Sequence, residues 1–139
     1  AFKTAQSWSK RAPTHKLQHS PEDQRKSPAG ATYGENVAIG TDLQPGQVVA
    51  RWYDEIRTTQ QGRVERATPG VGHYTQIVWK STMRVGCSMA QERQVVVCHY
   101  DPGGNVRGKY FSQVVPPLTT FADPDGERRC GGPVAELRV

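Results

Sequence analysis

The chain has 139 residues, which is enough for one domain with a buried core and too few for two. Its formal net charge of +5 favours a solvated basic surface first, and it would also suit contact with an acidic membrane surface or wall polymer. Nucleic acid is not an expected partner, because Lys and Arg are spread among Asp and Glu and form no basic run interleaved with aromatic residues. No apolar run approaches the roughly 20 residues that a membrane-spanning helix needs.

The first thirty residues predict a short helix followed by a loop. Residues 1–10 place Ala1, Ala5 and Trp8 at helical spacing. Residues 11–31 are polar and interrupted by three prolines, so they predict a loop with at most one helical turn. Two histidines, His15 and His19, lie in this loop. The Gly-Glu-Asn triplet that follows at 34–36 is, taken alone, typical of a turn.

The clearest helix spans residues 45–58 and begins with Pro45 near its first turn. Its apolar stripe is formed by Val48, Val49, Trp52, Tyr53 and Ile56. Asp54 lies opposite this stripe and is expected in solvent. Glu55 lies on its border, so it either reaches inward or forms a surface pair with Arg51.

The second half of the chain predicts strands. Residues 60–71 contain Gly and Pro but no aromatic residue, and they predict a surface loop. Residues 74–79 alternate β-branched and aromatic types, which predicts a half-buried strand with His73 at its opening. Residues 83–91 and 94–100 predict an antiparallel hairpin. A two-residue Glu92-Arg93 loop would place Cys87 directly opposite Cys98 on one face.

The last segment, residues 119–139, predicts a loop-rich extension with little regular structure after Thr120. Its Cys130 lies in a Gly-rich stretch. It is a free thiol, a modified one, or one paired between two chains.

Several stretches together resemble one family. Gly-His-Tyr-Thr-Gln-Ile-Val-Trp at 72–79 and Val-Val-Val-Cys-His-Tyr-Asp-Pro-Gly-Gly-Asn-Val at 95–106 resemble the two signature motifs of the CAP superfamily, which comprises cysteine-rich secretory proteins, antigen 5 and plant pathogenesis-related proteins. Leu-Gln-His-Ser at 17–20, Gly-Glu-Asn at 34–36 and Trp-Tyr-Asp-Glu-Ile at 52–56 are similar to further family motifs. The resemblance covers about residues 5–108.

The resemblance implies an α+β fold, a three-layer α-β-α sandwich around a small central antiparallel sheet. We expect the sheet to include residues near 74–79, 84–91 and 94–100. The expected CAP domain spans residues 1–118 and lacks the family's first helix, so it is N-terminally truncated relative to the family. Residues 119–139 form the extension.

The resemblance also implies a site. In the family, the positions that match His19, Glu35, Glu55 and His73 converge on one solvent-open cavity, although no local spacing in the sequence joins them. Two imidazoles and two carboxylates suit a divalent metal such as Zn²⁺, which is not a required cofactor. The alternative is a hydrogen-bonded polar cluster without metal. His99 is expected to be structural.

The family pairs the positions of Cys87 and Cys98 in a disulfide, which implies an oxidising, extracellular location for a secreted protein. The first functional hypothesis is a non-enzymatic binding module. Its ligand would be a lipid or sterol-like molecule, or a protein or membrane surface, although the loop at 60–71 lacks the aromatic residues linked with sterol binding in the family. The alternative is a metal-dependent hydrolase, a peptidase, with Glu35 or Glu55 as general base. A third hypothesis is a basic polyanion binder.

Overall fold

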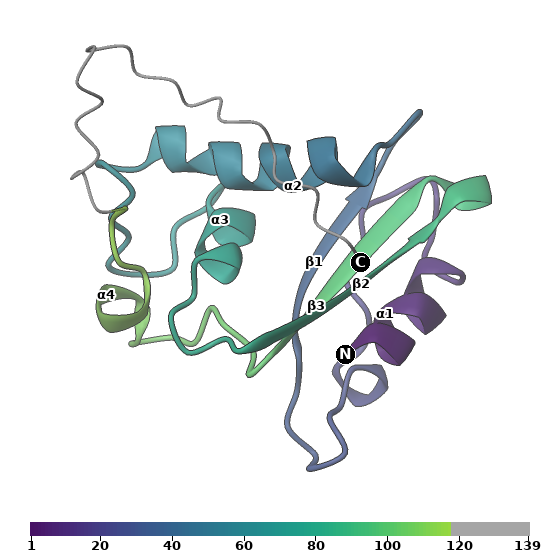
Figure 1. The fold of residues 1–139 in the computed structure, drawn as a ribbon, viewed down its shortest axis with the longest axis horizontal. Coiled ribbons are helices and arrows are strands. Elements are labelled where there is room, and N and C mark those ends of the chain that lie inside the picture. The colour runs from purple at the N-terminus through teal and green to yellow at the C-terminus, as the bar shows by residue number, and fades with distance from the viewer. Residues whose placement is uncertain (118–139) are drawn as a thin grey trace.

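The computed structural model describes residues 1–117, and its centre is a sheet of three antiparallel strands (Figure 1). The strands are β1 (Gly34–Ile39), β2 (Arg84–Ala90) and β3 (Val95–Asp101), and their order in the sheet is β1-β3-β2. The middle strand β3 is buried from Val95 to Tyr100. Its almost continuous apolar run is typical of a strand that is covered on both faces.

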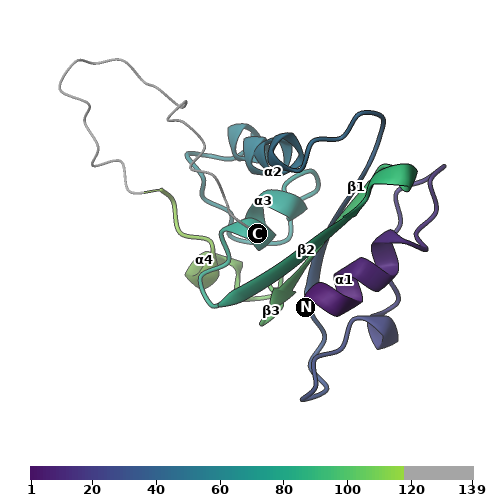
Figure 2. The same ribbon diagram turned by 45° about the vertical axis from the view of Figure 1, so that its right-hand side comes forward.

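Helices cover the two faces of the sheet, so the molecule has three layers (Figures 1 and 2). Helix α1 (Phe2–Ser9) lies on one face, where Ala5 and Trp8 pack with Val95 and Val97 of β3. Helices α2 (Pro45–Asp54) and α3 (Gly72–Ile77) lie on the other. On that side the buried face of α2 packs against alternate residues of β3, namely Val96, Cys98 and Tyr100. The three-layer α-β-α prediction is therefore confirmed. One strand can pack against both helix layers because successive side chains of a strand point to opposite faces.

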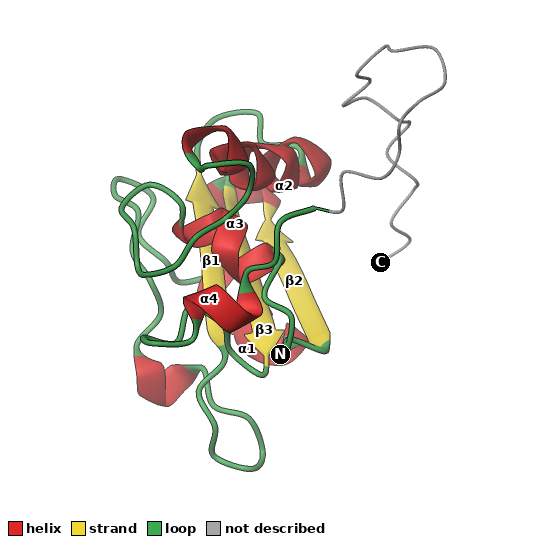
Figure 3. Cartoon of the chain, turned by 90° about the vertical axis from the view of Figure 1, so that its left-hand side faces the viewer, coloured by secondary structure: helices red, strands yellow, loops and turns green. Residues whose placement is uncertain are grey.

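The helix and loop predictions for the first half of the chain are confirmed. The helix predicted at 45–58 appears as α2, continued by the 3₁₀ turn η2 (Glu55–Thr58). The loop at 11–31 contains one helical turn, η1 (Glu22–Gln24). Residues 60–71 form a loop on the surface. The short helix α4 (Tyr110–Gln113) lies at the left of Figure 1, away from α1 at the right, and it stands in front of the sheet in Figure 3.

The strand predicted at 74–79 is wrong, because these residues form helix α3 and the turn after it. The alternation of β-branched and aromatic residues is also compatible with a helix that is enclosed on several sides. Three consecutive side chains, Tyr74, Thr75 and Gln76, are fully buried, which a strand with one solvent face would not allow. His73 therefore stands in the first turn of a helix and not at the opening of a strand.

The third strand of the sheet is β1, which contains the Gly-Glu-Asn triplet. Taken alone the triplet is typical of a turn, yet Glu35 pairs with His99 and Asn36 with Cys98 across the β1–β3 ladder. Polar residues occupy this strand because each finds partners in the folded protein.

The hairpin prediction is confirmed in register, since Cys87 stands opposite Cys98. The two are joined by a disulfide with 4.0 Å between their Cα atoms. The connection differs from the expected two-residue loop. A 3₁₀ turn, η3 (Gln91–Arg93), is followed by Gln94 in the left-handed conformation with φ 51°. The predicted extension at 119–139, with Cys130, lies outside the described residues.

Candidate functional site

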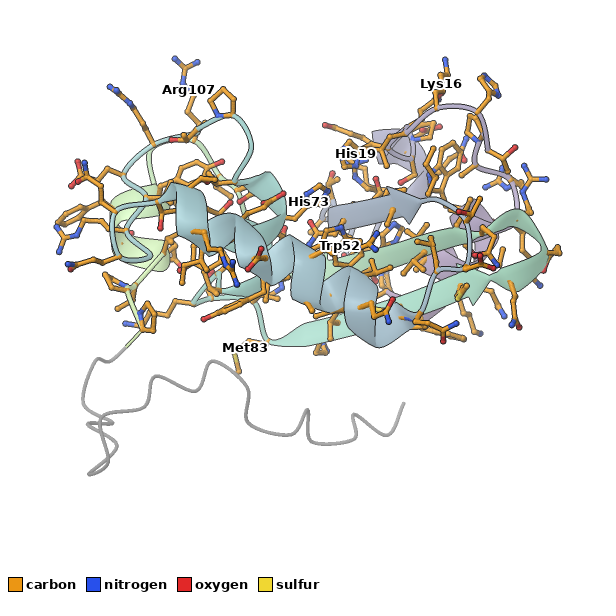
Figure 4. The ribbon with its side chains drawn as sticks, turned by 90° about the horizontal axis from the view of Figure 1, so that it is seen from above. Lys16, His19, Trp52, His73, Met83 and Arg107 are labelled. Carbon is orange, nitrogen blue, oxygen red and sulfur yellow. A yellow bond between two sulfur atoms is a disulfide. The ribbon has the colours of Figure 1, made fainter. Side chains whose placement is uncertain are left out.

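One cavity of about 200 Å³ brings together all four residues that the sequence singled out. His19, Glu35, Glu55 and His73 line it, and Asn36, Gly70, Gly72 and Asn105 complete its wall. Figure 4 shows that His73 approaches from α3 beside Trp52, whereas His19 comes from the loop that precedes β1. Solvent reaches both imidazoles, since the side chains of His19 and His73 are 57% and 27% exposed.

Glu35 is the most heavily hydrogen-bonded carboxylate of the site. Its Oε1 accepts from His19 Nδ1 at 2.7 Å and from the Ser20 amide at 2.9 Å. Its Oε2 accepts from the Ser20 hydroxyl at 2.6 Å and from His99 Nε2 at 2.9 Å. Arg25 adds a positive charge, with Nη1 3.6 Å from Oε1. The side chain is only 1% exposed, so these contacts replace nearly all of its water.

These contacts set the ionisation of Glu35. Burial by itself would raise the pKa of this carboxyl, but hydrogen bonds from His19, His99 and Ser20 outweigh it and lower the pKa from 4.5 to about 2. Glu35 is therefore ionised at neutral pH. Because a carboxylate can only accept, His19 donates through Nδ1 and His99 donates through Nε2.

Glu55 reaches inward from the end of α2. This is one of the two alternatives predicted for it, the other being a surface pair with Arg51. Its Oε1 accepts from His73 Nδ1 at 2.6 Å. Its Oε2 accepts from the backbone amides of His73 and Tyr74 at 2.9 and 3.0 Å, so the carboxylate satisfies free N–H groups at the start of α3. Asp54, by contrast, is exposed, as predicted, and it pairs with Arg57 on the surface.

Two contacts fix the ring of His73 and a third fixes its backbone. Trp52 stacks on it with ring centroids 5.6 Å apart and planes 12° from parallel. Glu55 holds Nδ1, and the backbone carbonyl of His73 accepts from Asn36 Nδ2 at 3.2 Å. The ring is thereby positioned with its Nδ1 edge turned towards Glu55.

Three further residues support the site and were not predicted as parts of it. Ser20 makes two of the hydrogen bonds to Glu35, and Asn105 lines the cavity while donating to the Gly72 carbonyl at 2.8 Å. Arg25 borders a neighbouring hollow of about 400 Å³ that shares His19, Glu35 and Asn105 with the cavity. Two of them lie within the motifs of the sequence, since Ser20 follows His19 directly and Asn105 ends the Pro-Gly-Gly-Asn turn.

A metal ion would find two imidazole nitrogens here. With Nδ1 of each ring bound to a carboxylate, Nε2 of His19 and of His73 is the nitrogen that carries a free lone pair in the neutral ring. A carboxylate on the other nitrogen is the usual outer support of a metal-binding histidine. Within residues 1–117, however, no three His, Cys, Asp or Glu side chains are grouped so as to hold a metal ion together. Within the described residues a cation would therefore meet two imidazole nitrogens, from His19 and His73, and no third His, Cys, Asp or Glu grouped with them.

The comparisons with known proteins identify the family of this chain. The model of the cysteine-rich secretory protein family, CAP, matches residues 1–100, and the chain therefore belongs to this family. A human relative, Golgi-associated plant pathogenesis-related protein 1, is 39% identical over 115 residues, which cover 76% of this chain and 69% of that protein. Pathogenesis-related protein 1A of Nicotiana tabacum is 40% identical over 89 residues, which cover 55% of this chain and 49% of that protein.

Solved structures share the fold. The crystal structure of NaASP2 with Zn²⁺ superposes with a TM-score of 0.62 at 29% identity and covers 89% of this chain and 69% of that one. The chain spans about half the length, or less, of several curated relatives, between 37% and 55% of three of them. Among the helices of the described part, none is long and apolar enough to cross a membrane.

Proposed function

We propose that this chain is a secreted, non-enzymatic binding module whose cavity binds a divalent cation, with Zn²⁺ the best match, between His19 and His73. The observation that carries the proposal is the pairing of both imidazoles. Each ring donates a hydrogen bond from Nδ1 to a carboxylate, and both rings line the same cavity. Two preset imidazole nitrogens on one cavity suit a borderline-soft cation such as Zn²⁺ better than Mg²⁺, which prefers oxygen ligands.

Two protein ligands are fewer than the four of a structural zinc site or the three of a catalytic one. We therefore expect reversible binding and a fold that does not require the metal. The related NaASP2 has a crystal structure with Zn²⁺, which supports the choice of metal for this chain.

The state of the carboxylates favours binding over catalysis. A general base works best when its pKa lies near the working pH. The pKa of Glu35 is about 2, and four donors already occupy its two oxygens. Glu55 accepts three hydrogen bonds that hold His73 and α3. Neither carboxylate is left free to take a proton from water.

The alternative function is a metal-dependent hydrolase, a peptidase, that uses the same cavity. A bound zinc ion would lower the pKa of its water towards neutrality. This function would require Glu55 to release at least one of its present donors during the reaction. It is the weaker of the two, because breaking those bonds also disturbs the start of α3.

Two observations support the proposal that the protein is secreted. The Cys87–Cys98 disulfide is stable in oxidising compartments, and the matching family is described as secretory. The proposed ligand is a hydrophobic small molecule, or a protein or membrane surface. Apolar side chains that reach solvent support this, among them Met83 at 79% and Phe111 at 66% exposure.

Calorimetric titration with zinc tests the cavity. We expect the native chain to bind one equivalent, His73→Ala to lose binding, and Glu55→Gln to bind roughly 10- to 100-fold more weakly because the ring loses its carboxylate partner. The matched control is His15→Ala, since His15 is exposed and does not line the cavity. Binding that persists in His73→Ala, or falls equally in His15→Ala, would leave the four residues as a structural cluster.

A further inference from the structure

A second surface lies around α4, at the end of the molecule opposite α1 (Figure 1). Phe111 on this helix is 66% exposed, although it is a large aromatic residue. Val106 and Val115, on either side of α4 in the chain, are 41% and 52% exposed. Exposed apolar side chains that gather in one place mark an interaction surface more often than isolated ones do.

One cationic side chain lies over this exposed aromatic ring, and two more are close to it in the chain. The guanidinium of Arg63 lies over the Phe111 ring, 5.7 Å from its centroid. Arg107 and Lys109 lie directly before α4 and are exposed. We call the set formed by Phe111, Val106, Val115, Arg63, Arg66, Arg107 and Lys109 the α4 surface.

The nearest hollow adds polar groups to the α4 surface. A cavity of about 600 Å³ is bordered by Arg63 and Arg66 together with three threonines whose hydroxyls donate to backbone carbonyls, Thr58, Thr59 and Thr68. Glu65 also borders it and lies 3.8 Å from Arg63, but both side chains are more than half exposed and the pair is weak. The two guanidinium groups are donors suited to the oxygens of a phosphate or carboxylate.

Arg63 is presented by a tight turn rather than by a loose loop. Gln61 and Gly62 both take left-handed conformations, with φ of 55° and 83°. The Gly62 carbonyl accepts from the buried hydroxyl of Tyr74 at 3.0 Å. The turn therefore keeps Arg63 beside Phe111 without a partner being present.

We propose that the α4 surface docks on an anionic lipid bilayer. Phe111 and its apolar neighbours enter the interface, and the cations contact acidic headgroups, one of which the cavity beside Arg63 and Arg66 accepts. Each Lys or Arg near an anionic membrane strengthens binding about fivefold. Phe is one of the apolar residues that interfacial segments bury at the boundary between headgroups and acyl chains.

This inference rests on the proposed binding function and names an anionic membrane as the partner, bound at a place separate from the cavity. The α4 surface shares no residue with the cavity of His19 and His73. The zinc titration therefore tests the cavity alone, and the membrane-binding experiment tests the α4 surface alone.

Co-sedimentation with vesicles tests the proposal on the full chain. We expect binding to vesicles of phosphatidylcholine with phosphatidylserine, little binding to phosphatidylcholine alone, and weakening by added salt. Phe111→Ser should lower the partition coefficient about tenfold. Arg63→Gln with Arg66→Gln should lower it roughly fivefold for each charge removed.

Matched controls lie at the far end of the molecule. Phe2 on α1 is 50% exposed, and Lys16 stands away from Arg107 in Figure 4. Phe2→Ser and Lys16→Gln should leave the partition coefficient unchanged within about twofold, because neither lies on the α4 surface. Absent binding, equal binding to both vesicle types, or equal losses in the controls and the α4 variants would overturn the proposal.

Discussion

His99 Nε2 lies 2.9 Å from Glu35 Oε2, and neither side chain has more than 1% of its surface exposed. The pair joins the core to the cavity. On the other edge of the ring, His99 Nδ1 lies 2.8 Å from the Thr4 hydroxyl on α1. On the other oxygen, Glu35 holds His19 in the cavity wall. The packing of α1 on the sheet and the position of His19 thus depend on one hydrogen-bonded chain.

Replacing His99 by Phe keeps an aromatic ring of similar size and removes both nitrogens. We expect the free energy of unfolding to fall by about 2–3 kcal/mol, because a buried ionised carboxylate loses a donor. Urea denaturation measures this. His15→Phe is the control on an exposed loop, and an equal, small effect of both variants would show that the pair adds nothing to stability.

The Glu35 pKa predicts a specific dependence of stability on pH. The folded pKa, about 2, lies below the ordinary value of 4.5. Ionised Glu35 therefore contributes its full stabilisation of the folded state above about pH 4.5. This contribution is roughly 3 kcal/mol, and it is lost as the pH falls from 4.5 towards 2. The slope between pH 5 and 2 should be shallower in Glu35→Gln. The control Glu22→Gln, at an exposed position, should keep the native slope. Identical slopes in all three proteins would contradict the assignment.

Sequence patterns correctly predicted those helices and strands whose contacts join residues close together in the chain. The stripe on residues 45–58 identifies α2 because neighbouring turns of one helix share the same core. The hairpin register places Cys87 opposite Cys98 because a short connection fixes it, even though the turn itself differs from the expected one. The strand β1 shows the opposite case. Glu35 occupies an inward position only because His99, 64 residues away, supplies a donor.

The cavity could not be derived from spacing either. Glu55 and His73 come from different helices, and His19 comes from a loop, so their approach depends on how α2, α3 and the loop pack. The resemblance to the family supplied that convergence. Helix α3 was predicted as a strand because β-branched and aromatic residues dominate it. Its burial on several sides is a tertiary effect that overrides such local preference.

The disulfide between Cys87 and Cys98 closes a short loop of chain, with 11 residues of sequence separation. Replacing both cysteines by Ala should lower the free energy of unfolding by about 3 kcal/mol, mainly because the unfolded chain regains freedom. Urea denaturation of the variant, beside the native chain with and without reductant, measures the loss. If reductant shifts the double variant as much as the native chain, the effect does not come from this bond.

Glu55→Gln separates the two candidate functions. In a binding module, the native chain with zinc should show no turnover of peptide substrates above the buffer rate, and the variant should differ only in zinc affinity. Peptide cleavage that chelator abolishes, and that Glu55→Gln destroys without unfolding the protein, would instead establish the hydrolase. Circular dichroism checks the fold of the variant, since Glu55 also binds the first amides of α3.

Gly104 allows a close approach next to the cavity wall, and its replacement should be costly. A Cβ atom there would lie 2.6 Å from Gln76 Nε2 and 2.8 Å from Trp79 Cγ, and both of these side chains are buried. Gly104→Ala should therefore lower the free energy of unfolding by about 2 kcal/mol or more, since neither neighbour has room to move.

Gly46 offers the matched control for Gly104. It lies in α2, and a Cβ atom there would meet no atom within 4 Å. Gly46→Ala should raise the free energy of unfolding by about 0.5–1 kcal/mol, because Ala loses less backbone freedom in a helix. Urea midpoints of the two variants should thus move in opposite directions. If Gly104→Ala is as stable as the native chain, Gln76 and Trp79 are less tightly enclosed than their burial indicates.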